Sequence, residues 1–142
     1  MRPQMVRIAR NVGVSPERVV AHAVALHAED AVACNAFDKV YCVFDRDKHT
    51  TFDAALQRIK DLSADGKPFV AITSTPCFEF WLLWHFGYTD QPFQAAGKKS
   101  VGDPVVSALK TKPDFGKYGK GQKGIYGQLK DKLADALTHA DR

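Results

Sequence analysis

Apolar residues follow two kinds of spacing along the first part of the chain. Spacings of three and four predict amphipathic helices over residues 15–29 and 52–66, the first opened by a Ser-Pro-Glu start that is typical of helix N-termini. Nearly continuous apolar runs bounded by charge, at residues 38–44 and 67–73, are typical of strands buried in a parallel sheet. A third and unusually apolar stretch, residues 77–86, predicts a central helix.

Strands and helices that alternate with short connections predict an α/β fold, a small parallel sheet flanked by helices. Residues 41–44 and 69–73 are its expected adjacent strands, and residues 6–8 are a candidate for one more. Residues 90–124 form a loop-rich basic segment with six glycines, three prolines and one short helical signal. An apolar stripe then predicts a C-terminal helix over residues 125–140.

Length and composition add the protein class. A chain of 142 residues, 45% hydrophobic and 25% charged, suits a single globular domain over residues 1–142. Its three cysteines have no CxxC spacing and are expected to be reduced thiols that fill small spaces in the core. Neither a secretory signal nor a membrane span is indicated, so we expect a cytoplasmic protein that does not bind membranes.

Positive charge is concentrated late in the chain. Residues 98–132 contain nine lysines and three aspartates, a net charge of +6, which leaves about −2 for the remainder. Lysines among glycines suggest a surface that contacts the phosphates of nucleic acid. The alternative is a flexible loop whose lysines are merely solvated.

Two aspartates directly after the first strand are the most informative polar residues. In extended chain the side chains of Asp45 and Asp47 would point the same way, with Cα atoms about 6.5 Å apart. Two carboxylates so placed can bind Mg²⁺ or Mn²⁺, and the carboxyl end of a parallel sheet is where such folds bind ligands. Alternatively, one aspartate caps the helix that begins near Thr51.

A second polar stretch follows the next strand and opens the apolar helix. Thr75 is the expected N-cap and Pro76 the expected first helical residue, at the same sheet edge as the two aspartates. Glu79 in the first turn is either a partner of the helix dipole or a site carboxylate. His85 is either a hydrogen-bonded core residue or a ligand.

These residues together resemble the RloB-like family. The family's pattern is similar to V-F-D-R-D at residues 43–47 and to S-x-P-C-F-E-x-W-L-L-x-H-F at residues 74–86, which contains Ser74, Pro76 and His85. A late Y-x-K element of the family resembles Tyr118-Gly119-Lys120. The resemblance covers most of the chain.

The resemblance implies a TOPRIM-related fold and a metal-dependent nuclease of a bacterial defence system against phage, of the abortive-infection or restriction-linked kind. Asp45 and Asp47 would then hold Mg²⁺, with Glu79 as a third catalytic carboxylate. The nucleic-acid backbone would contact three lysines of the basic segment, Lys117, Lys120 and Lys123. An ATPase encoded nearby is the implied protein partner.

Two departures from the family pattern leave alternatives open. Thr75 replaces the family's asparagine, and no EGxxTE-like segment with its strand-ending glutamate precedes Ser15. The chain is therefore either a clipped form of the enzyme or a non-catalytic component that binds nucleic acid or protein. A third interpretation is that one of the two aspartates is a phosphoacceptor. An unpaired sheet edge would expose backbone polar groups, so we expect residues 6–8 or, preferably, a second copy in a homodimer to cover it.

Overall fold

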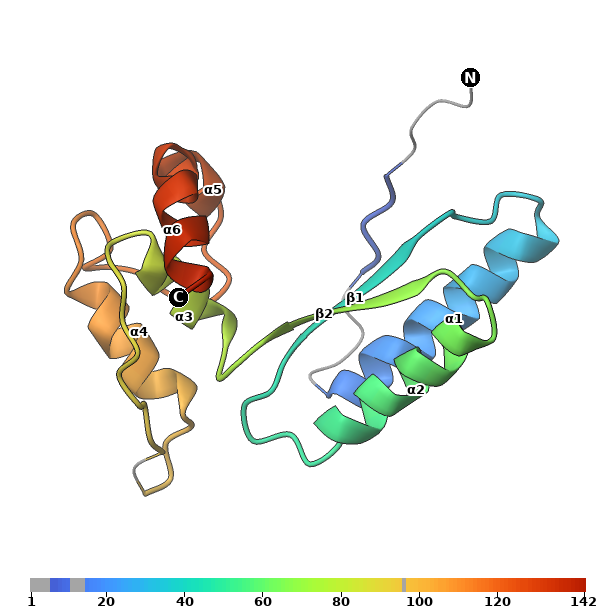
Figure 1. Ribbon diagram of the computed structural model, residues 1–142, viewed down its shortest axis with the longest axis horizontal. Helices are drawn as coiled ribbons and strands as arrows, with labels where there is room; N and C mark the ends of the chain where they lie inside the picture. Colours follow the sequence, from blue (N-terminus) through green and yellow to red (C-terminus); the bar gives the residue numbers. More distant parts are fainter. Residues whose placement is uncertain (1–5, 11–14, 96) are drawn as a thin grey trace. The chain divides into compact units, whose positions relative to one another are not determined.

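The computed structural model describes residues 6–10, 15–95 and 97–142, and these fall into two compact units (Figure 1). The first unit contains the described residues up to Phe44 together with Thr50–Ile72. The second contains Asp45–His49 and the described residues from Thr73 onward. The carboxyl ends of both strands therefore belong to the second unit, where all the predicted site residues lie. The prediction of a single domain stays a prediction.

Two helices and two strands build the first unit. In chain order they are α1 (Pro16–Val32), β1 (Val40–Asp45), α2 (Phe52–Ala64) and β2 (Phe69–Ser74). Helices α1 and α2 run alongside each other (Figure 1), and all four elements contribute to one apolar core. That core consists of Val20, Cys42, Phe44, Phe52, Ala55, Ile59 and Phe69. The predicted order of helices and strands is confirmed.

The two strands are adjacent and parallel, as predicted. The Val40 amide donates to the Pro68 carbonyl oxygen at 2.8 Å, and the Arg46 amide donates to the Ser74 carbonyl oxygen at 2.9 Å. Since both bonds join residues with the same offset along the chain, the strands run in the same direction. Along β1, Cys42 and Phe44 are buried while the alternate residues are exposed. The expectation of a strand buried on both faces was wrong, because only one face of β1 packs into this core.

Helices form most of the second unit. They are α3 (Phe78–Trp84), α4 (Gly102–Lys110), α5 (Ile125–Leu129), the 3-10 turn η1 (Lys130–Lys132) and α6 (Leu133–Ala140). Helix α3 packs against both α4 and α6. The core of this unit is formed by Cys77, Leu82, Leu83, Val105, Leu109, Phe115, Tyr118 and Leu129. The very apolar helix predicted after the second strand is thus central to its unit.

The start of α3 differs from the prediction. The helix begins at Phe78 with Cys77 as its N-cap residue, so Thr75 is not the N-cap and Pro76 is not helical. The Thr75–Pro76 peptide bond is cis. The Pro76 carbonyl oxygen accepts a hydrogen bond from the Asp47 amide at 2.9 Å, whereas the first turn of α3 uses the Cys77 carbonyl oxygen. A contact with another segment therefore sets the start of this helix.

Three further expectations need correction. The C-terminal helix is interrupted by η1, where Lys132 turns so that its ammonium lies 4.2 Å from the centre of the Phe86 ring. Residues 6–8 form no strand, and Val6 and Ile8 are almost fully exposed. Cys42 and Cys77 are buried free thiols, but Cys34 is exposed and fills no core space.

Within the described residues, no helix has both the length and the apolar composition of a membrane span.

Leu109 provides a test of the second core. Its side chain is fully buried, so Leu109→Ala should lower the free energy of unfolding by about 2–5 kcal/mol through lost burial and a residual cavity. Urea denaturation followed by the fluorescence of Trp81 and Trp84 measures this change. Leu137→Ala, at a position of α6 that is 54% exposed, should change stability by less than about 0.5 kcal/mol. Equal effects of the two variants would contradict this assignment of the core.

Candidate functional site

Asp45 ends β1 at the carboxyl edge of the sheet. The neighbouring strand ends at Ser74, and the backbone bond from Arg46 to Ser74 holds the two ends together. The Asp45 carboxylate accepts hydrogen bonds from the Ser74 hydroxyl and from the backbone amide of Phe78, the first residue of α3. Asp45 therefore joins the ends of both strands to the start of α3.

Glu79 is a buried carboxylate in the first turn of α3. It is only 5% exposed, and the Tyr118 hydroxyl donates a hydrogen bond to its Oε1 at 3.2 Å. The Cys77 thiol donates a second hydrogen bond to the same carboxylate. Tyr118 comes from the loop that follows α4, so this bond ties a distant segment of the chain to α3. Glu79 therefore does more than interact with the dipole of α3, because its carboxylate also accepts hydrogen bonds from Tyr118 and Cys77.

Burial and the Glu79 charge keep both donors protonated. Burial first, and then the Glu79 charge, raise the pKa of Tyr118 to about 12. Burial together with the hydrogen bond to Glu79 and the Glu79 charge raises the pKa of Cys77 to about 12. At neutral pH both groups are therefore hydrogen-bond donors, and Cys77 is not a reactive thiolate.

Lys120 brings a positive charge to the same place. A Cβ atom added to the buried Gly102 would lie 3.1 Å from Lys120 Nζ and 3.5 Å from Cys77 Sγ. The ammonium of Lys120 is thus close to the first residue of α4 and to the N-cap of α3. Its charge also acts on Asp45. The absence of a side chain at residue 102 leaves the room that the lysine occupies.

The electrostatic balance at Asp45 is unfavourable to its charge. Burial is the largest effect and raises the pKa of Asp45, and the nearby Glu79 charge raises it further. Hydrogen bonds from the Phe78 amide and the Ser74 hydroxyl, together with the Lys120 charge, lower it but do not compensate fully. Two carboxylates thus share one site with a single lysine, an arrangement in which an added cation would be stabilised.

Asp47 does not continue the strand. Its φ angle is +33°, and it lies in a turn in which the His49 amide donates to the Arg46 carbonyl oxygen at 3.2 Å. The extended spacing expected for the two aspartates was therefore wrong, because the chain leaves the sheet after Asp45. Asp47 Oδ1 is nevertheless shielded from solvent and has no hydrogen-bond partner. Neither aspartate is the N-cap of α2, which is Thr51.

The donor chemistry at this edge fits a hard cation. Asp45 and Asp47 offer carboxylate oxygens, and the unpartnered Oδ1 of Asp47 is an acceptor whose hydrogen-bonding capacity is unused. Mg²⁺ usually keeps several waters and binds proteins through one or two carboxylates. Among residues 6–10, 15–95 and 97–142, no group of three or more His, Cys, Asp or Glu side chains is arranged to hold a metal.

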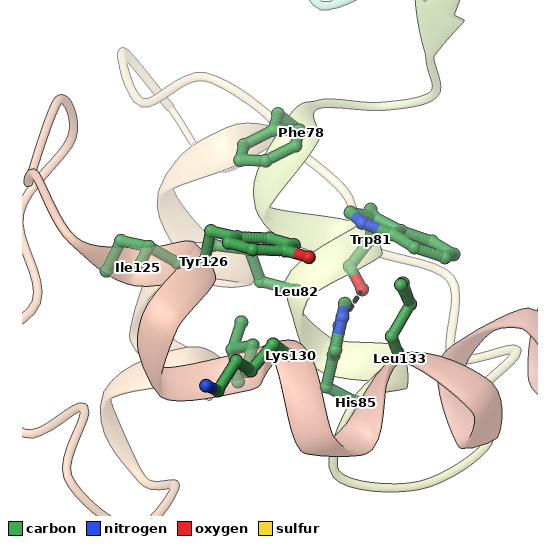
Figure 2. Close-up of a pocket in the computed structure, with 9 residues that line it drawn as sticks. Phe78, Trp81, Leu82, His85, Ile125, Tyr126, Lys130 and Leu133 are labelled. Atoms are coloured by element: carbon green, nitrogen blue, oxygen red, sulfur yellow. Dashed lines mark hydrogen bonds between the residues drawn. The ribbon is translucent and has the colours of Figure 1, made fainter.

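The remaining predicted residues lie in different surroundings. His85 is buried, and its Nδ1 lies 3.1 Å from the Trp81 carbonyl oxygen, the environment of a hydrogen-bonded core histidine. It lines a mainly apolar pocket (Figure 2), not the cluster around Glu79. Lys117 and Lys123 are exposed. The second unit therefore brings together five of the predicted residues, which are Asp45, Ser74, Glu79, Tyr118 and Lys120.

Two neighbours of the site were not foreseen from the sequence. Cys77 was interpreted as a core filler, although its position two residues before Glu79 was a signal that the two side chains could meet at a helix start. Gly102 gave no signal, because its role depends on the approach of Lys120 from a distant loop.

Comparison with known proteins identifies a family. A family model described as RloB-like protein matches residues 3–142, nearly the whole chain. No curated protein and no solved structure matches the chain.

The unfavourable charge of Asp45 can be tested through stability. Since the folded state raises the pKa of Asp45 above its ordinary 3.8, the folded protein holds the proton more tightly, and ionisation destabilises it at neutral pH. Asp45→Asn should therefore raise Tm at pH 7. The gain should shrink as the pH falls toward the ordinary value, since the wild-type carboxyl is then protonated in both states.

Thermal unfolding followed by circular dichroism from about pH 3.5 to 7.5 measures this dependence. Asp90→Asn, at an exposed loop position, is the matched control and should change Tm little at any pH. A lower Tm for Asp45→Asn than for the wild type at pH 7 would show that hydrogen bonds to this carboxylate outweigh its burial.

Proposed function

The chain belongs to the RloB-like protein family, and from that premise we propose that it is a metal-dependent phosphodiesterase that cleaves nucleic acid at the cluster around Asp45 and Glu79. The observation that carries the proposal is the meeting of these two carboxylates with Lys120. They come from a strand end, a helix start and a distant loop, yet the charges of Glu79 and Lys120 both act on Asp45. Two acids and a lysine at the carboxyl edge of a parallel sheet are suited to binding a phosphodiester and promoting its cleavage.

Each residue has a distinct role in this proposal. Asp45 and Asp47 would hold Mg²⁺, or Mn²⁺ in its place; the ion, when bound, supplies Lewis-acid polarisation of a phosphate oxygen. Lys120 binds a non-bridging phosphate oxygen and positions the phosphodiester beside the carboxylates. Glu79 contributes a fixed negative charge, because Tyr118 and Cys77 hold its carboxylate in one orientation. Partial burial of Asp45 limits the access of bulk water and strengthens these interactions.

The basic segment extends the proposal to the substrate. Lys117 and Lys123 flank the Y-x-K element and are exposed, so both are free to approach a polyanion. Their proposed partners are phosphates next to the one that Lys120 binds. The same proposal includes five further points: a relation to the TOPRIM fold, a role in phage defence, an ATPase partner encoded nearby, a homodimer and a cytoplasmic location.

A second candidate is a non-catalytic component that binds nucleic acid or protein. One observation favours it: the carboxylates already have structural partners. Asp45 accepts hydrogen bonds from the Phe78 amide and the Ser74 hydroxyl, and Glu79 accepts them from Tyr118 and Cys77. In this reading the cluster stabilises the start of α3, and the lysines alone bind phosphate.

Cleavage assays separate the two candidates. With Mg²⁺ or Mn²⁺ the wild-type protein should cleave DNA or RNA, EDTA should stop cleavage, and Asp45→Asn should lower the rate about 100-fold or more. Gel analysis of labelled strands measures the rate, and fluorescence anisotropy measures binding. If the Tm of Asp45→Asn is at or above that of the wild type, its inactivity does not result from unfolding. Cleavage by Asp45→Asn at the rate of Asp90→Asn would favour the non-catalytic candidate.

The lysines should determine how binding responds to salt. Substituting Lys117, Lys120 and Lys123 together by Ala should weaken nucleic-acid binding and flatten the plot of log K against log salt concentration. The slope should fall by about 0.9 for each phosphate contact removed from duplex DNA. A triple Ala variant of Lys39, Lys60 and Lys67, outside the basic segment, is the control. An unchanged slope would mean that the three lysines only solvate a loop.

A further inference from the structure

A pocket in the second unit is lined by neither carboxylate of the cluster nor by Lys120, although Phe78, whose amide donates to Asp45, is one of its walls. It has a volume of about 140 Å³ and is bounded by α3 on one side and by α5, η1 and the start of α6 on the other. Figure 2 shows Tyr126 drawn between Phe78 above and Lys130 below, with Trp81 and His85 completing the wall. Of the residues predicted from the sequence to belong to the site, His85 alone lines this pocket.

Aromatic rings at this pocket are unusually exposed. Tyr126 is 74% exposed and Phe78 is 47% exposed, although both belong to helices whose other faces pack into the core. Beneath them, Leu82 and Leu129 are almost fully buried and belong to that core. The pocket thus has a buried apolar base and exposed aromatic walls, which is how proteins present a surface for stacking.

The charge of the residues around the pocket indicates which aromatic ligands it would bind. Of the nine residues that line the pocket, one is a lysine, Lys130, and none is a carboxylate. The pocket also adjoins the end of the lysine-rich segment, residues 98–132, whose net charge is +6. An aromatic ligand that carries negative charge matches this environment.

The volume of the pocket limits the ligand to one planar ring system. An apolar cavity of about 150 Å³ is large enough to bind benzene, and the present pocket is about that size and partly open to solvent. A nucleobase fits this description, and the phosphate on its own nucleotide supplies the negative charge. Bases in a duplex are stacked on one another and cannot enter such a pocket.

We infer that this pocket binds one unpaired base of a nucleic acid strand, with Tyr126 and Trp81 stacking on the base and Lys130 contacting its phosphate. The inference rests on the proposed function for the nucleic-acid ligand and adds that the ligand is single-stranded. Unlike the lysine contacts, which recognise any polyanion, this contact requires the base itself.

Equilibrium binding in EDTA tests the pocket without cleavage. The probes are a labelled single-stranded oligothymidylate and a strand of equal length that has abasic sugars throughout, compared by fluorescence anisotropy. The wild-type protein should prefer the strand with bases. Tyr126→Ala should weaken binding of that strand about 5- to 100-fold and leave the abasic strand unaffected, because stacking on an aromatic residue contributes about that factor for each base.

Two further variants keep the result interpretable. Tyr126→Phe retains the ring and should retain the affinity, whereas Tyr88→Ala, at an exposed tyrosine outside the pocket, should leave it unchanged. Equal binding of the two strands by the wild type, equal losses for both strands in Tyr126→Ala, or no binding of either strand would overturn the inference. Cleavage assays are separate: an inactive protein that still shows the Tyr126 effect contradicts only the catalytic proposal.

Discussion

The hydrogen bond from Tyr118 to the buried Glu79 carboxylate is the interaction on which the second unit depends. A carboxylate that is 5% exposed is costly to bury, and each donor that is lost would leave part of that cost unmet, about 1–3 kcal/mol. Tyr118 and Cys77 supply the donors, one from a distant loop and one from the N-cap of α3. The same bond that satisfies Glu79 therefore fixes the loop that carries Lys120.

Fixing that loop creates the charge arrangement of the site. Lys120 lies near Cys77 and Gly102 because Tyr118, two residues earlier, is held by Glu79. Asp45 meets this cluster from the strand end, and burial together with the Glu79 charge makes its ionisation unfavourable. Proteins commonly accept such a local loss of stability at sites where charge performs a function. The cluster is thus a structural tie and, in the proposed function, also the place where the phosphodiester is held.

Much of the fold was predictable because its signals are local. The spacing of apolar residues identified α1, α2 and both strands, and the short connections identified their parallel pairing. Predictions failed where a distant contact overrides a local preference. The Pro76 carbonyl oxygen accepts a hydrogen bond from the Asp47 amide, so α3 begins two residues later than its Thr-Pro signal indicates. Asp47 lies in a turn, so the expected extended spacing does not apply.

The sequence by itself determined which residues are polar at the strand ends and in the first turn of an apolar helix. Four of the candidate site residues that it marked are Asp45, Glu79, Tyr118 and Lys120. Only the tertiary structure decided that these four meet within one unit and that His85 lies elsewhere. Residue type and spacing encode the hydrogen bonds of a helix or strand, which join near neighbours. The bond between Tyr118 and Glu79 joins segments that become neighbours only when α3 and α4 pack together, and no local pattern records that distance.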